Sequence, residues 1–199
     1  DQADLDVWEE VIHRARGVGN PKGVYFGIRE FLRAVGRRGC GGSDKAWLWE
    51  CFRRLKQAQV SIAIIDEKGR RKASFMGSLL GSNVLESNGR YFVELNPEVT
   101  SLFGQGRWSK VDHTQRMTLG RDHLAKWLHG YFASHLNPYP TKVSTLMSLS
   151  GSAGTTLRNF RGKVRKALEK LQAVGALEAW TVDADDLVRV RKPSVPRPR

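Results

Sequence analysis

Residues 155–172 read TTLRNFRGKVRKALEKLQ, and this stretch decides the fold of the second half of the chain. Its apolar residues recur at intervals of three and four, as they do on one side of an α-helix. They are Leu157, Phe160, Val164, Ala167, Leu168 and Leu171. We therefore expect a helix that begins at Thr155 or a neighbour, packs this side into a core, and ends before Gly175.

The opposite side of the expected helix is strongly basic. Six Lys or Arg residues and one Glu lie between Thr155 and Lys170, which gives this segment a net charge of +5. Like charges three and four residues apart repel each other, so the helix loses stability unless an anion neutralises them. Phosphate is the expected anion, which favours DNA as the ligand.

The residue types on this side fit contacts with a duplex. Arg and Asn side chains near a helix N-terminus can make bidentate contacts with guanine and adenine in the major groove, so the base-reading candidates are Arg158, Asn159 and Arg165. Thr155 and Thr156 lie at the positive end of the helix and suit phosphate contact. The other DNA-binding candidates on this helix are Arg161, Gly162, Lys163 and Lys166.

Gly162 lies in the middle of the basic side. A glycine there costs the helix about 1 kcal/mol relative to alanine. The missing side chain permits close approach to a groove wall, whereas a tolerated surface glycine explains the residue equally well. Both interpretations stay open.

The residues around this helix predict a winged helix. The expected elements before it are a connection at 104–118, a helix from about Leu119 to Leu136, a short strand at Lys142–Val143 and a brief helix capped by Ser144. After it come two strand-like runs, Ala176–Val182 and Leu187–Arg191, which form the wing. In the second run valines alternate with Arg189 and Arg191, so we expect both arginines to face outward and contact phosphates.

The first half repeats this order. The expected elements are a helix from Asp4 to about Arg16, a strand at Val24–Phe26, helices at Ile28–Val35 and from Ser43 or Asp44 to about Gln59, and strands at Val60–Asp66, Arg71–Leu80 or beyond, and Arg90–Leu95. The repeated order predicts an α+β fold with two tandem winged-helix (helix-turn-helix) domains. We expect the domains at residues 1–104 and 105–192, followed by a basic, Pro-rich tail at 193–199.

The equivalent helix of the first domain is less basic. Its cations are offset by Asp44 and Glu50, which leaves a net charge of +2. We expect backbone contact or a protein interface there rather than base reading. The candidates are Lys45, Arg53, Arg54 and Lys56.

The charge of the whole chain agrees with this division. The 199 residues carry a formal charge of +13, of which 1–106 contribute +3 and 107–199 contribute +10. Such an excess is typical of proteins with a polyanionic partner, although a solvated surface is the rival interpretation. The sequence thus places its basic surface in the second half.

Several other classes of protein are not indicated. Cys40 and Cys51 form no CxxC pattern, and no apolar run approaches the ~18 residues of a membrane span. The glycine-rich segments 36–42 and 151–155 lack a phosphate-loop lysine, and the five histidines form no HxH pair. We expect a cytosolic protein without catalysis, cofactor or metal.

Four stretches carry a resemblance to a known family. They are residues 4–9 (DLDVWE), 24–26 (VYF), 53–56 (RRLK) and 120–131 (GRDHLAKWLHGY). Together with the two-domain order, they resemble the TrfA family of plasmid replication initiators over nearly the whole chain. The stretch around Trp127 is the most specific, because its aromatic and polar order is not demanded by a generic helix.

The resemblance implies a function. Members bind repeated sites called iterons at a plasmid origin, promote opening of an adjacent A+T-rich region, and bring in host helicase machinery. In related initiators the second winged helix reads bases, while the first contacts the backbone and can mediate dimers. The implied partners are origin DNA, a host replication initiator, the replicative helicase and the sliding clamp, with a monomer–dimer equilibrium. The implied location is the bacterial cytoplasm, in association with nucleoid or plasmid DNA. Ser101–Phe103 is similar to clamp-docking peptides, but a buried Leu-Phe pair explains it more simply.

Two alternatives remain at this point. A winged-helix transcriptional regulator would use the same DNA chemistry on promoter DNA, and would recognise a single palindrome rather than repeats. Alternatively, the first domain is chiefly a protein-interaction module, given its apolar strands and weak charge.

Overall fold

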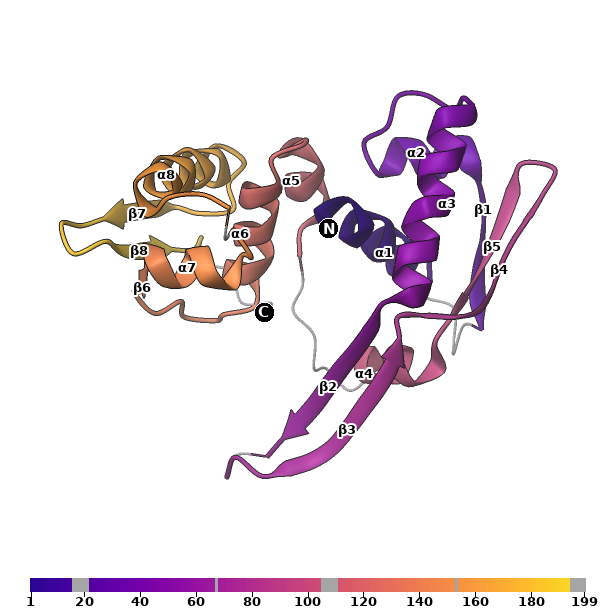
Figure 1. The fold of residues 1–199 in the computed structure, drawn as a ribbon, viewed down its shortest axis with the longest axis horizontal. Coiled ribbons are helices and arrows are strands. Elements are labelled where there is room, and N and C mark those ends of the chain that lie inside the picture. Colours follow the sequence, from indigo (N-terminus) through magenta and orange to yellow (C-terminus); the bar gives the residue numbers. More distant parts are fainter. Residues whose placement is uncertain (16–21, 67, 105–110, 153, 194–199) are drawn as a thin grey trace, which may run out of the picture. The chain divides into compact units, whose positions relative to one another are not determined.

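The computed structural model describes residues 1–15, 22–66, 68–104, 111–152 and 154–193. The chain divides into two compact units, Asp1–Trp108 and Ser109–Arg199, each with its own core (Figure 1). Helices and strands are mixed in both, which confirms the α+β class. The expected domain boundary at 104/105 adjoins residues outside the described ranges, and the tail lies outside them from residue 194 onward.

The first unit packs helices against a three-stranded antiparallel sheet. Its elements are α1 (Gln2–Ala15), β1 (Gly23–Gly27), α2 (Ile28–Ala34), α3 (Gly42–Gln57), β2 (Gln59–Ile65), β3 (Arg71–Ser78), β4 (Leu80–Ser87), β5 (Arg90–Leu95) and α4 (Pro97–Gly104). The sheet has the order β1-β5-β4, while β2 and β3 form a separate hairpin. Several aromatic residues cluster within a largely aliphatic core, where Phe26 stacks on Phe31 at 4.2 Å between ring centroids.

Two expectations about the first unit are corrected. The run that begins at Arg71 is two strands, because the chain leaves the β2–β3 hairpin at Leu79 and β4 joins the other sheet. Alternation alone cannot detect such a change of partner. Asp4, where the first helix was expected to begin, lies inside α1 and is buried. Between β4 and β5 the chain turns at Asn88–Gly89, with positive φ at both residues, as a two-residue hairpin loop requires.

The second unit packs α8 across the other helices and a small sheet. Its elements are α5 (His113–Thr118), α6 (His123–Ala133), β6 (Thr141–Lys142), α7 (Val143–Leu149), α8 (Leu157–Ala173), β7 (Ala179–Val182) and β8 (Leu187–Arg191). The sheet is antiparallel with the order β6-β8-β7. The core is built on buried side chains of α6, α7 and α8.

The expected helix from Leu119 to Leu136 is wrong at its start. The chain forms α5 where a connection was expected, turns at Gly120 with φ +61°, and begins α6 at His123. Both helices start at an aspartate: Asp112 accepts from the Gln115 amide and Asp122 from the Ala125 amide. Such caps set where each helix begins. Ser144 does not cap α7, which starts at Val143 without a side-chain cap.

Candidate nucleic-acid interface

Helix α8 is built as its sequence predicts. Its first residue is Leu157, and Thr156 caps it by accepting a hydrogen bond from the Asn159 amide at 3.3 Å. Gly175 follows its C-terminus with φ +75°, a conformation that favours glycine. Five of the six predicted core residues are buried and Leu157 is half-buried, so the predicted buried side is confirmed.

The solvent side of α8 has two chemically different flanks. At 100° per residue, Arg158, Arg161 and Arg165 lie on one flank, and Asn159 and the lysines lie on the other. We call these the arginine flank and the lysine flank; the lysines are Lys163, Lys166 and Lys170. The exposed Gly162 lies between the flanks, and apart from the neighbouring backbone of α8 no atom of the described residues lies within 4 Å of a Cβ built on it.

The arginine flank is bound to the turn between β7 and β8. The Arg161 guanidinium donates to both carboxylate oxygens of Asp186, from Nε at 2.7 Å and from Nη2 at 2.5 Å. Arg165 Nη2 donates to the Val182 carbonyl at 3.4 Å. The hydrogen bond from Arg161 lowers the pKa of Asp186, so this carboxylate is charged at neutral pH. Arg161 therefore fastens the wing to α8.

The arginines of β8 also have carboxylate partners. Arg189 pairs with Asp183, and this hydrogen bond is the leading reason that the pKa of Asp183 is lowered. Arg191 makes two hydrogen bonds to Glu178, at 3.0 and 3.1 Å. Both arginines face outward as predicted, yet each already binds an anion of the protein itself.

The lysine flank borders α6 across a shallow depression of about 400 Å³. Lys170 crosses it to pair with Asp122 at 2.6 Å. The depression is lined by Asp122, Leu124, Lys163, Lys166, Glu169 and Lys170. Lys163 and Lys166 are exposed and form no ion pair within the described part of the chain.

The predicted residues of α8 therefore fall into two groups. Arg158, Asn159, Lys163 and Lys166 are exposed, and their side chains have no hydrogen-bond partner among the residues that the structure describes. Arg161 and Arg165 are engaged by the wing, and Thr156 serves as the helix cap. The side chains of the first group can bind a ligand without losing a contact. Those of the second group must first give up a hydrogen bond or ion pair within the protein.

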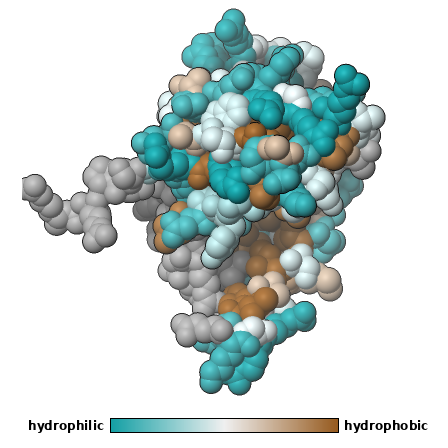
Figure 2. Space-filling view, turned by 90° about the vertical axis from the view of Figure 1, so that its left-hand side faces the viewer, coloured by the Kyte–Doolittle hydropathy of each residue, from teal (hydrophilic) through white to brown (hydrophobic). Residues whose placement is uncertain are grey.

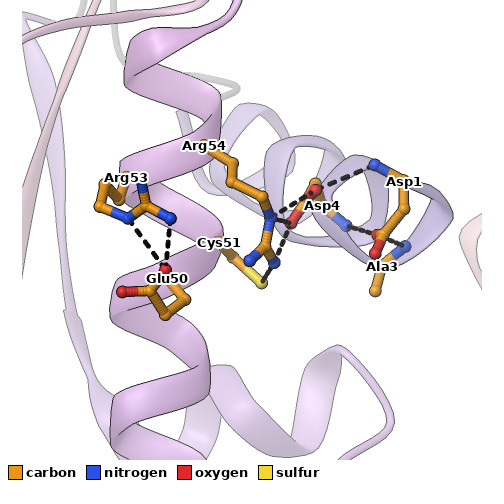
Figure 3. Close-up of polar contacts among 7 residues, drawn as sticks. All are labelled: Asp1, Ala3, Asp4, Glu50, Cys51, Arg53 and Arg54. Carbon is orange, nitrogen blue, oxygen red and sulfur yellow. Dashed lines mark hydrogen bonds and ion pairs between the residues drawn. The ribbon is translucent and has the colours of Figure 1, made fainter.

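The first-unit candidates are mostly engaged inside the protein. Arg54 makes a bidentate pair with the buried Asp4, with contacts of 2.7 to 3.1 Å (Figure 3). Arg53 pairs with Glu50, also shown in Figure 3, and Lys56 donates to the Ser82 carbonyl. Burial alone would raise the pKa of Asp4, but the hydrogen bond from Arg54 contributes to a net lowering. Lys45 is exposed without such a partner in the described ranges.

Sequence reasoning missed the acidic partners. The segment 183–186 contains three aspartates beside a basic strand, and that composition is the signal that could have identified them. It also missed a buried polar group under α6, where Arg116 is fully buried and donates to the Lys126 carbonyl. Beside it, His129 Nε2 bonds Gln115 Oε1 at 3.1 Å, while its Nδ1 is buried without a partner in the described residues.

The described ranges hold neither a metal-binding cluster nor a helix that could span a membrane. His, Cys, Asp and Glu side chains there form no group of three or more that could hold a metal ion. No described helix combines the length and apolar character needed to cross a membrane.

The chain resembles known proteins in both fold and sequence. In fold, the chain resembles domains 2 and 3 of RctB, with a TM-score of 0.58 and 14% identity over 85% of this chain and 68% of that structure. In sequence, it is 25% identical over 194 residues to the plasmid replication initiator protein TrfA of Escherichia coli. That match covers 96% of this chain but half of the relative. The model of the TrfA protein family matches residues 1–192, and the chain belongs to this family.

Proposed function

We propose that the chain is a plasmid replication initiator that binds direct repeats at an origin and promotes opening of an adjacent A+T-rich region, without catalysis. The observation that carries this proposal is the exposed basic side of α8 in a member of the TrfA family. The E. coli relative of this family is named for the same activity. A duplex supplies the phosphates that the uncompensated cations of α8 require.

Each unit is proposed to be a winged helix. The order helix, strand, helix, helix, hairpin occurs in both, as α1-β1-α2-α3-β4-β5 and as α6-β6-α7-α8-β7-β8. In both sheets the first strand pairs with the last, and the last pairs with the strand before it. The hairpin β2–β3 is an insertion in the first unit. The domains are proposed at 1–104 and 105–192, with 193–199 as a tail.

In this proposal α8 enters the major groove. Arg158 and Asn159 lie in its first turn, where side chains reach base edges, and Arg165 lies about two turns further along the same flank as Arg158. Lys163 and Lys166 carry mobile point charges and suit phosphates of one strand. Thr155 and Thr156 lie at the helix N-terminus and suit a phosphate there.

The paired arginines take a different role from the one their sequence suggests. Arg161 holds the wing against α8 through Asp186, so it positions the wing. Arg189 and Arg191 exchange a carboxylate for a phosphate on binding, which reduces their net gain. In the first unit, Lys45 and the exposed, Glu50-paired Arg53 suit backbone contact, while Arg54 and Lys56 are structural.

Footprinting on the origin of the plasmid that encodes the chain tests the proposal. We expect protection of several direct repeats beside an A+T-rich tract, with lower affinity for scrambled DNA. Equal affinity for both DNAs would overturn specific binding. Protection of one palindrome over a promoter would instead indicate a transcriptional regulator. Permanganate reactivity of thymines in the A+T-rich tract checks strand opening, and it must depend on the protein.

A further inference from the structure

The hairpin β2–β3 stands apart from the sheet of the first unit. Strand β2 pairs only with β3, and the described residues place no third strand on either edge. Figure 1 shows the turn of the hairpin projecting beyond the helices of its unit. A two-stranded hairpin is only marginally stable by itself in water. An extended hairpin of this kind therefore indicates a contact at its end.

All the charge of this hairpin is concentrated at its tip. Residues 59–65 and 73–78, the stalk, contain no charged side chain, whereas the tip, 66–72, reads DEKGRRK with a net charge of +2. The lower end of Figure 2 shows this pattern, with a hydrophilic tip beyond hydrophobic stalk residues. Charges that merely protect a sheet edge from pairing would lie along the strands. Here the strands are neutral and the turn is basic.

The turn at the tip is fixed by Asp66. Its carboxylate accepts hydrogen bonds from the Lys68 and Arg70 amides, at 2.9 and 2.8 Å, and from the Arg70 guanidinium at 2.9 Å. Asp66 therefore offsets Arg70 and organises the loop. Lys68, Arg71 and Lys72 are exposed, and none of them has an ion-pair partner among the described residues.

An irregularity in the pairing lies beside these cations. Ile64 pairs with Ala73 and Ile65 with Arg71, so the ladder skips Lys72. In a regular strand, adjacent side chains point to opposite faces. A bulge breaks that alternation and re-aims a side chain, so Arg71 and Lys72 need not diverge. The extra residue, Lys72, lies at the tip end of the hairpin, next to Arg71.

We propose that the tip of the β2–β3 hairpin, through Lys68, Arg71 and Lys72, is a binding site for the phosphate backbone of duplex DNA. The inference rests on the proposed DNA binding of the chain. It places most of the first unit's contact with DNA at the hairpin tip rather than on α3. On α3, Arg53, Arg54 and Lys56 have partners within the protein. The contact is to phosphate, so it is independent of DNA sequence.

The test compares the full chain with the variant Lys68→Gln, Arg71→Gln, Lys72→Gln on a short random-sequence duplex. Affinity is measured by fluorescence anisotropy over a series of salt concentrations. Each lost phosphate contact lowers the slope of log K against log salt by about 0.9, so we expect a decrease of about 2 to 3. One unit of slope corresponds to about tenfold in affinity between 1 M and 0.1 M salt, so near 0.1 M salt we expect roughly 100- to 1,000-fold weaker binding.

A matched control removes the same charge elsewhere in the first unit. Arg29, Arg33 and Arg38 are exposed and have no ion pair among the described residues, so all three are changed to Gln. An equal loss of slope in this control would overturn the proposal, because the effect would be that of net charge. The exchange Arg71→Lys with Lys72→Arg keeps both charges and should bind like the unchanged chain.

The other outcomes are also decisive. If the unchanged chain fails to bind any duplex, the proposed function fails. If it binds and the neutral tip variant binds equally well at every salt concentration, only the hairpin site is overturned. Unfolding midpoints show whether the triple variant is folded. The three single substitutions serve if it is not, and each should lower the slope by about 1.

Discussion

Asp186 shows how much of the basic surface is already neutralised within the protein. It has φ +60° and sits in the β7–β8 turn, where its backbone carbonyl accepts from the Val143 amide. Its carboxylate binds Arg161, and its neighbour Asp183 binds Arg189. The wing thus carries anions of its own beside the proposed phosphate sites. Phosphate must compete with them, which lowers affinity for DNA in general.

A substitution of Glu178 tests this competition. Glu178→Gln releases Arg191, whose guanidinium is paired only with Glu178 among the described residues. Because a freed cation adds one phosphate contact, affinity for random duplex should rise by up to about tenfold at low salt, with a steeper salt dependence. Anisotropy titrations check this, with Glu86→Gln as the matched loss of one negative charge, because the exposed Glu86 carboxylate accepts from the Gly89 amide rather than from a cation. An equal rise in both variants would contradict the prediction.

Arg158 and Lys166 should differ in what they contribute. Arg158→Ala is expected to cost about 1 to 3 kcal/mol on the specific site and to relax specificity, because a bidentate base contact is lost. Lys166→Ala should weaken specific and random DNA alike and lower the salt slope by about 1. Competition binding against repeats with single base changes measures both effects. Equal effects of the two substitutions on specific and random DNA would contradict the assignment of a base contact to Arg158 and a phosphate contact to Lys166.

His129 predicts a dependence of stability on pH. Burial is the main cause that lowers its pKa from 6.5 to about 4, with a contribution from the Arg116 charge. Gln115 Oε1 can only accept, so Nε2 carries the proton, and protonation would place a charge on the partnerless Nδ1. The unfolded chain binds this proton near pH 6.5 and the folded chain only near pH 4. Stability is therefore complete above pH 6.5 and falls as the pH drops toward 4.

The expected loss across this window is roughly 2 to 3 kcal/mol. Urea unfolding at successive pH values measures it. His129→Gln removes the titration while keeping a group that can hydrogen-bond, so its profile should be flatter between pH 4 and 6.5. A profile parallel to that of the unchanged chain would show that other groups cause the dependence.

At the scale of elements, local pattern predicted α8 but not its surroundings. Phe160 and Leu168 follow helical spacing, and Thr156 and Gly175 mark the ends, so both could be read from neighbours in sequence. The pairing of Arg161 with Asp186 spans 25 residues and depends on how the hairpin folds back. The break before α6 was missed because Leu119 continues the apolar spacing through the turn at Gly120.

One substitution with two measurements distinguishes the two interpretations of Gly162. Apart from the neighbouring backbone of α8, a Cβ there would meet no atom of the described residues, so Gly162→Ala should stabilise the folded chain by about 0.5 to 1 kcal/mol through helix propensity. If the groove wall approaches α8 at this point, the same methyl group weakens DNA binding. We expect higher stability in urea together with lower affinity. Higher stability with unchanged affinity would show a tolerated surface glycine.

At the scale of the whole chain, the charge partition and family resemblance agree on a division of labour. Residues 107–199 carry +10 of the +13, and the exposed, unpartnered side chains of α8 belong to that half. Composition could predict this much. The sequence could not show which basic side chains of the first unit are paired within the protein, because pairs such as Arg54 with Asp4 join residues 50 apart. The proposed origin function rests mainly on the family match, since charge alone supports only DNA binding.

The proposed binding to direct repeats predicts a stoichiometry. A two-fold symmetric dimer presents its two reading helices in opposite orientations and matches a palindrome. Direct repeats all run in one direction, so each must be read by a separate chain in the same orientation.

We expect duplexes with one, two and three repeats to bind one, two and three chains, measured by sedimentation velocity at saturation. Two chains on a single repeat would contradict this and favour the view of the first unit as a protein-interaction module. A duplex with one repeat inverted is the control: it should still bind one chain per repeat, because no contact between symmetric partners is needed.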